Sequence, residues 1–382
     1  MKLSLFHLTS MLTLALVHAA TRMRARPCQH AEEEELGRLY DHALAEGGAI
    51  VLWAAGDTTA AMDWYCRAFQ QRFPGLRLQV HVDRAHGHCA HIEHFLAGNG
   101  RGPDLILLQS AAGFERWKAQ GALLEYRPLG AQRQKPGYAD PEGAWITAWD
   151  SVLVPLFRSD VPAAEQPQSY AGFLIPSLHG RLVLTWPHDD DVVLYLLDRL
   201  QRAYGIDYLR RLAAMDPYFV HGTSVPAALL EHSTRFIGSL TGQAVDPGGA
   251  VPAARRWLPQ RAPLAACNQR MAIFKAARHP FGARLALAWT ASFGFQSSLA
   301  TWRARSDVGE PPGLPPLDSL HGADVTGFNR WVADDDRVRA LRSQMRALFG
   351  PHAGTSLQPG DEAAGRFERV AGHGLARPEP CC

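Results

Sequence analysis

The feature that most restricts the fold is a regular alternation of strand-like and helix-like segments between Ala49 and Gln120. The apolar runs at 49–55 and 104–109 are typical of strands buried on both faces, and 76–83 is a further predicted strand. Strands that alternate with helices predict a parallel sheet covered by helices on both sides. The helices are expected at 31–47, 60–73, 88–97 and 111–120.

The pattern changes at 144–157, where an extended segment contains Pro155. Proline is unfavourable inside a central strand, so this segment predicts a crossing between two lobes. We therefore expect an α/β protein with two lobes, a mixed, mostly parallel sheet in each and a ligand cleft between them. The expected divisions are 31–148 for the first part of lobe 1, 149–268 for lobe 2 and 269–350 for a return to lobe 1.

Both ends of the chain are expected to lie outside the packed lobes. Residues 1–20 carry one lysine, a leucine-rich run and a small-residue end, a pattern that predicts a secretory signal cleaved near Ala19 or Ala20. A membrane anchor is the alternative, but polar residues interrupt this run, which falls short of the roughly 20 residues that a spanning helix needs. Residues 351–382 are expected to form a flexible tail. The sequence thus predicts a secreted protein, extracellular or periplasmic.

Charge and cysteine content restrict the partners. The 39 basic and 37 acidic residues are interspersed, which argues against a nucleic-acid partner. We expect a monomer that binds a small molecule or an ion. Six cysteines in an exported chain predict disulfides, with a bridge between Cys66 and Cys89 as one candidate and the adjacent Cys381 and Cys382 as a feature of the tail.

Candidate ligand contacts follow the predicted strands. The loop 56–59 and the acidic segment 188–191 each join a strand to a helix, where open α/β sheets place ligands. Helix capping is the alternative for both segments, although a third acid at 188–191 could also contact a cationic ligand or pair with an opposing arginine. Trp149 could stack on a ligand or fill the hinge core. The candidate residues are Asp57, Thr58, Asp83, His88, Gln109, Ser110, Trp149, His188, Asp189, Asp190 and Thr223.

A histidine cluster between His81 and His94 offers a different chemistry. His88, His91 and His94 have the spacing of one helix face, so they could converge on a divalent metal. The alternative is a solvated helix face. A metal-dependent secreted enzyme is therefore one alternative function, although His-Glu-x-x-His, nucleophile-elbow, phosphate-loop and Rossmann patterns are all absent from the sequence. No other cofactor is expected.

Several stretches resemble the type II extracellular, or periplasmic, solute-binding proteins, in particular an iron(III)-transport-like branch with secreted fungal as well as bacterial members. These stretches are 43–57, 69–83, 102–110, 114–128, 140–145, 180–198 and 268–280. The resemblance implies a non-enzymatic protein that closes its lobes over a ligand and, in a bacterium, passes it to an ABC-type permease. His88 stands where the family usually has histidine.

The resemblance also raises the question of the ligand. Iron-binding members of the wider superfamily hold the metal with two adjacent tyrosines, and none of the nine tyrosines here has a tyrosine neighbour. The histidine cluster is therefore the feature that keeps a divalent or ferric metal as a candidate ligand. A secreted interaction protein that keeps the lobes without a ligand is the remaining alternative.

Overall fold

The computed structural model describes residues 28–109, 111–162, 166–188, 190–245, 247–248, 254–259 and 261–350. The expected signal at 1–20 and the expected tail at 351–382, with Cys381 and Cys382, lie outside the described residues. So do the two candidate ligand contacts Ser110 and Asp189. Among the described helices, none is both long enough and apolar enough to cross a bilayer.

The first lobe has the predicted strand–helix alternation. A helix at 28–45 precedes β1, and β1 lies between β2 and β3, parallel to both. Alternate residues of β1 face opposite sides of this sheet, so its apolar run contributes to two separate cores. The elements are β1 (Ala49–Ala55), α2 (Asp63–Arg72), β2 (Arg77–Asp83), α3 (Ala85–Leu96), β3 (Leu105–Leu108) and α4 (Ala111–Ala119).

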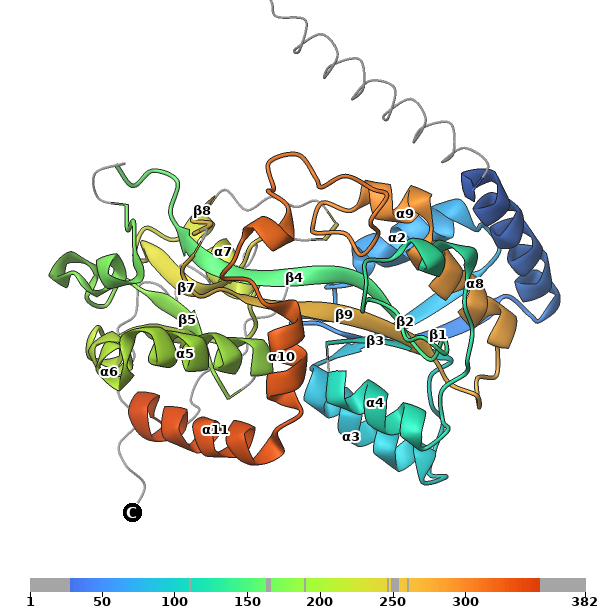
Figure 1. The fold of residues 1–382 in the computed structure, drawn as a ribbon, viewed down its shortest axis with the longest axis horizontal. Helices are drawn as coiled ribbons and strands as arrows, with labels where there is room; N and C mark the ends of the chain where they lie inside the picture. The colour runs from blue at the N-terminus through green and yellow to red at the C-terminus, as the bar shows by residue number, and fades with distance from the viewer. Residues whose placement is uncertain are drawn as a thin grey trace, which may run out of the picture.

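Two long strands connect the lobes. β4 (Ile146–Phe157) and β9 (Ala265–Ile273) pair antiparallel and run along the length of the molecule (Figure 1). The main sheet has the order β2-β1-β3-β9-β4-β7, with β8 (Arg255–Arg256) also on β4, so both lobes share one sheet. Its parallel pairs lie in the first lobe, and its centre is antiparallel. Pro155 lies where the pairing of β4 with β7 (Gly238–Gln243) shifts register.

The second lobe packs helices around a short parallel pair, β5 and β6. Helix α5 is buried along most of its length, and its apolar residues form a core with α6. These elements are β5 (Val183–Thr185), α5 (Asp191–Tyr204), α6 (Ile206–Ala214), β6 (Tyr218–Val220) and α7 (Val225–His232). Short 3₁₀ turns lie at Leu129–Arg133, Tyr170–Leu174, Pro176–Leu178 and Leu317–Ser319.

The last third of the chain is divided between the lobes. Helices α8 (Pro280–Ala291) and α9 (Phe293–Ser298) pack in the core of β1 and α2, as a return to lobe 1 requires. Helices α10 (Val325–Val332) and α11 (Asp335–Phe349) instead pack with α5 and α6, because their apolar residues belong to the second-lobe core. The expectation that all of 269–350 returns to lobe 1 therefore differs from the observed packing after α9.

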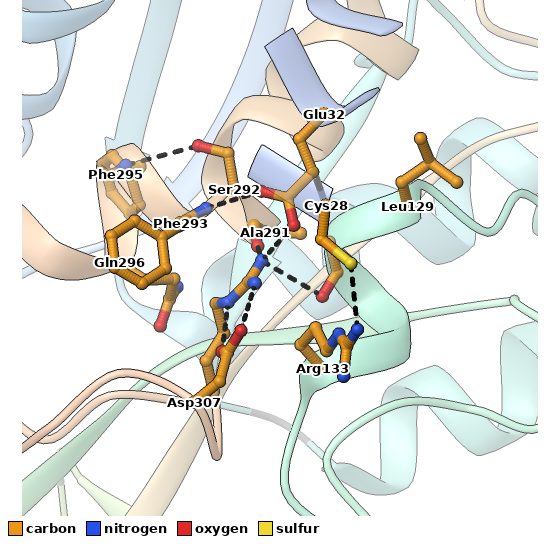
Figure 2. Close-up of polar contacts among 12 residues, drawn as sticks. Cys28, Glu32, Leu129, Arg133, Ala291, Ser292, Phe293, Phe295, Gln296 and Asp307 are labelled. Carbon is orange, nitrogen blue, oxygen red and sulfur yellow. Dashed lines mark hydrogen bonds and ion pairs between the residues drawn. The ribbon is translucent and has the colours of Figure 1, made fainter. Parts of the chain in front are cut away.

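The helix at 28–45 is held by a buried ion network (Figure 2). Arg305, 1% exposed, donates to Glu32 Oε1 at 2.9 Å and to the Ala291 carbonyl at 2.9 Å. It also forms two 2.8 Å bonds to the Asp307 carboxylate. The second oxygen of Glu32 accepts from the Phe293 backbone N–H, so this one helix residue is tied to both α9 and the segment after it.

The bridge between Cys66 and Cys89, one candidate from the sequence, is not formed. No disulfide joins any two of Cys28, Cys66, Cys89 and Cys267 in the described part of the chain. Cys66 packs with the core of α2 and α8, whereas Cys89 packs with the core of α3 and α4. Because these cores lie on opposite faces of the sheet, the two thiols cannot meet.

Candidate functional site

A cleft of about 700 Å³ lies where the two lobes face each other. Its walls come from the loop after β1 and the start of α2 in the first lobe, and from the starts of α5 and α7 in the second. Its floor comes from the connecting strands β4 and β9. The cleft therefore lies at strand ends and helix N-termini, where an α/β protein is expected to hold a ligand.

On the first-lobe side, a tight turn presents Asp57 and Thr58. The Gly56 N–H donates to the Asp83 carbonyl at 3.1 Å, which ties the ends of β1 and β2 together. A Cβ atom on Gly56 would lie 2.7 Å from the side chains of Ala61 and Val82. A larger residue would therefore displace the turn and the two side chains that it presents.

On the second-lobe side, the segment before α7 is fixed by two neighbouring strands. The Thr185 hydroxyl, at the end of β5, donates to the Gly222 carbonyl at 3.0 Å. The backbone N–H of Gln243, at the end of β7, donates to the Thr223 carbonyl at 3.0 Å. The start of α7 is thus held in place by two strands of its own lobe.

Asp57 joins the two walls directly. Its Oδ2 accepts hydrogen bonds from the Ser224 N–H and the Ser224 hydroxyl, both at 3.0 Å, and from the Thr223 hydroxyl at 3.4 Å. Gly222, at φ +87°, makes this approach possible, since a Cβ there would lie 2.6 Å from Asp57 Cβ. The lobes of this structure are therefore in contact across the cleft.

A second carboxyl group, Asp190, lies at the start of α5. Its Oδ1 caps the helix by accepting from the Val192 and Val193 N–H groups at 2.7 and 3.3 Å. Burial, and next the negative charge of Asp57, raise the pKa of Asp190 to about 7. The cleft therefore brings together one acidic group from each lobe, close enough for the charge of Asp57 to raise the pKa of Asp190.

The remaining lining mixes charged, aromatic and amide groups. Asp63 and Arg67 pair at 4.0 Å on the exposed side of the cleft. The half-buried Trp64 lies edge-on to Trp149, with ring centroids 5.6 Å apart, and Trp149 is 4% exposed. Trp149 therefore packs in the core at the hinge and also lines the cleft, and its stacking on a ligand stays a prediction. Other polar lining residues are Arg84, Gln109, Ser151, Glu231, Gln243 and Gln269.

Six of the sequence candidates lie in this lining, and their role in ligand binding stays a prediction. They are Asp57, Thr58, Gln109, Trp149, Asp190 and Thr223. Three other candidates are absent from it. Asp83 is exposed and accepts from the Arg84 N–H, His88 is buried beneath β1, and His188 lies beside Trp186.

The predicted histidine metal site does not form. His88 Nε2 donates to the Ala54 carbonyl at 3.0 Å and its ring stacks on Trp53, whereas His91 and His94 are exposed. One imidazole therefore points into the core while two face solvent, despite their helical spacing. In the part of the chain that the structure describes, no three His, Cys, Asp or Glu side chains gather as a metal site.

The described lining of the cleft also lacks the usual ligands of ferric iron. It contains neither tyrosine nor histidine. Of its four acids, Asp57 is engaged by α7, Asp190 by α5 and Asp63 by Arg67. Since no three candidate ligand side chains gather among the described residues, the metal ligand expected from the histidines finds no support in this cleft.

Sequence reasoning missed several lining residues. Trp64 lies in the first turn of α2, and Ser224 is the residue before α7, next to the predicted Thr223, so a search of these two helix starts would have found them. Gln243 and Gln269 lie on β7 and β9, two strands that the sequence pattern did not reveal. No local signal marks them, since only the pairing of distant strands brings them to the cleft.

Comparison with known proteins shows the fold. No protein-family model and no curated protein matches the sequence. Iron-bound HitA from Pseudomonas aeruginosa is similar in structure, with TM-score 0.60 and 15% identity over 78% of this chain and 99% of that one. AfuA from Actinobacillus pleuropneumoniae, with fructose-6-phosphate bound, gives 0.63 and 16% over 79% and 99%. The substrate-binding protein of an ABC transporter from Agrobacterium tumefaciens gives 0.63 and 15% over 79% and 94%.

These likenesses confirm the expected architecture. The chain has the two-lobed α/β fold of the type II periplasmic binding proteins. The similar proteins have an iron ion in one case and a sugar phosphate in another, so the fold is shared by proteins of different ligand chemistry. The ligand of this chain must therefore be argued from its own cleft, and its predicted place in an iron-transport-like branch stays a prediction.

Proposed function

We propose that this protein is a non-enzymatic solute-binding protein that captures a small polar ligand in the cleft between its lobes. The observation that carries the proposal is the cleft itself, where polar groups of both lobes and an indole ring converge above the connecting strands. Concave sites in which polar groups converge beside apolar and aromatic side chains are typical of small-molecule binding. The likeness in fold to binding proteins supports it.

The mechanism that we propose is closure of one lobe against the other. Ligand would first contact the loop after β1 and the start of α2, and the starts of α5 and α7 would then close over it. Closure removes water from the cleft and so strengthens each polar contact inside it. Bending is expected in the strands β4 and β9, since they join the lobes.

The setting of this function is also a proposal. We propose that the protein is exported under a signal at residues 1–20, acts as a monomer, and delivers its ligand to an ABC-type permease if its host is a bacterium. A fungal member would have another role, such as scavenging. The convergent polar groups of the cleft favour a binder over a ligand-free interaction protein, for which a cleft without such groups would be expected.

Native mass spectrometry of the purified protein tests this function. We expect a small molecule to be carried through purification and released on unfolding. Because the half-buried indole of Trp64 lines the cleft, Trp64→Ala should lower the affinity roughly tenfold.

Trp53→Ala is the matched control, because Trp53 is also half-buried in the first lobe but lies outside the cleft lining. Equal loss of ligand from both variants would count against the proposal. So would X-ray scattering in which the protein does not become more compact when the identified solute is added.

A further inference from the structure

The contact between Asp57 and α7 has the chemistry of an anion bound at a helix N-terminus. The acceptor is a carboxylate oxygen, and its donors are one backbone N–H and two hydroxyl groups at the start of the helix. Helix N-termini bind phosphate and carboxylate groups because their N–H groups are unpaired and the helix dipole is positive there. Here the anion is part of the protein and comes from the opposite lobe.

We propose that Asp57 determines the charge of the ligand, because its carboxylate occupies the donors at the start of α7 and thereby excludes anionic solutes from the cleft. The cleft is left to neutral or cationic polar solutes. This inference rests on the proposed solute-binding function and names the class of ligand that the same site accepts.

The donors that Asp57 occupies are built for an anion. Thr223 is 8% exposed, and its backbone is fixed by β7, while β5 fixes Gly222. Fixed donors bind a charged acceptor without the cost of ordering a loop. A phosphate or carboxylate group that reached them would therefore bind well if Asp57 did not hold the position.

The groups around this contact also disfavour an anion. The described lining carries four acids, Asp57, Asp63, Asp190 and Glu231, against two arginines, Arg67 and Arg84. Arg67 is paired with Asp63. The side-chain oxygen of Gln109 is buried without a hydrogen-bond partner among the described residues, so it can accept from a ligand N–H or O–H group. A neutral or cationic hydrogen-bond donor fits this lining.

The test is calorimetric titration of inorganic phosphate into the full chain at low ionic strength. Wild-type protein is expected to show no binding at millimolar phosphate. Asp57→Ala empties the donors at α7, so its affinity for phosphate should rise by at least about tenfold over the wild-type limit.

Two controls separate occupation of the donors from simple loss of charge. Asp57→Asn removes the same charge but keeps an oxygen that can accept from Ser224, and it should not gain phosphate binding. Asp63→Ala removes a cleft acid that does not touch α7, and it should not gain it either. Asp57→Ser, whose side chain is too short to reach α7, replaces Asp57→Ala if the alanine variant does not fold.

The inference is supported if Asp57→Ala, or Asp57→Ser in its place, binds phosphate while neither control does. The inference is overturned if these variants do not bind phosphate, if the wild type binds it equally well, or if the controls gain it to the same extent. The readout does not need the native ligand. If native mass spectrometry finds no solute on the wild-type protein, the proposed function is contradicted. The phosphate titrations still decide the role of Asp57 in that case.

Discussion

Asp150 is a carboxyl group buried in the middle of the connecting strand β4, with no exposed surface. It accepts from the Tyr138 hydroxyl at 2.9 Å and from the Asn268 amide at 2.7 Å. Burial raises the pKa of Asp150 to about 7, although the positive charge of Lys135 and these hydrogen bonds oppose the shift. The folded protein therefore favours the protonated form of this group.

Asp150→Asn should make the free energy of unfolding less dependent on pH. The pKa of this carboxyl is near 3.8 in the unfolded chain and near 7 in the folded one. Its protonation therefore stabilises the fold fully below about pH 4, and this stabilisation is lost as the pH rises to 7. Asparagine keeps the neutral form, and the variant should be more stable than wild type at pH 8. Urea unfolding between pH 4.5 and 8 measures this effect.

A control for that experiment is Asp207→Asn, because Asp207 is highly exposed on α6. Its pH profile should follow that of the wild type. Asp190 should keep a part of the pH dependence in Asp150→Asn, since burial and Asp57 raise its pKa in the same direction. An Asp150→Asn profile as steep as that of wild type would contradict the prediction.

At the scale of single residues, the sequence located the part of the cleft that follows strand ends. Asp57 and Asp190 were predicted because polar residues at those positions face the ligand side of an open α/β sheet, and Thr223 lies in a segment that was predicted to open a helix. The contact between Asp57 and Ser224 was not predictable, because it joins residues that are 167 positions apart. His88 was predicted to be a ligand from its spacing with His91 and His94. Spacing along a helix does not tell which face is buried, and His88 lies on the buried one.

At the scale of elements, periodicity predicted β1 at its observed bounds and the neighbouring strands to within one residue at either end. The strands β7 and β9 were missed. In β7, Gly238 and Gly242 give no strand signal, yet a Cβ on Gly242 would lie 2.2 Å from Leu156 Cδ1, so the packing of β4 requires glycine there. In β9, Asn268 and Arg270 are buried polar residues whose partners come from other elements.

The helix at 28–45 should depend on Glu32 far more than on its neighbour Glu33. Glu32 is 4% exposed and bonded to the buried Arg305, whereas Glu33 pairs with Arg72 at the surface. Arg305 keeps its pair with Asp307 when Glu32 is removed, but it loses one charged hydrogen bond and the Phe293 N–H loses its acceptor, so Glu32→Ala should cost about 1.5–3 kcal/mol. Glu33→Ala should cost roughly 1 kcal/mol or less.

Chemical denaturation of both variants measures these costs, with wild type as reference. The comparison is matched, since both substitutions remove a glutamate from adjacent positions of one helix (Figure 2 shows Glu32). Losses of similar size would show that the network around Arg305 adds little beyond a surface ion pair.

At the scale of the whole molecule, the two lobes are not independent packing units. The connecting strand β4 contributes Leu153 to the core of the second-lobe helices, Trp149 to the core of β1 and α2, and Val154 to the core around α7. The sequence predicted two lobes but not this shared sheet, because it gave no sign of β9. A continuous sheet with cores on both faces couples the stability of one lobe to that of the other.

This coupling predicts a single unfolding transition. Leu196→Ala, at a fully buried position of α5, should cost about 2–5 kcal/mol and lower the whole calorimetric peak without splitting it. Leu44→Ala, at a position 41% exposed, should leave the peak close to its wild-type temperature. Lobes that unfold separately would instead give Leu196→Ala a new peak at lower temperature beside an unshifted one, because only the second lobe would then feel the cavity in its core.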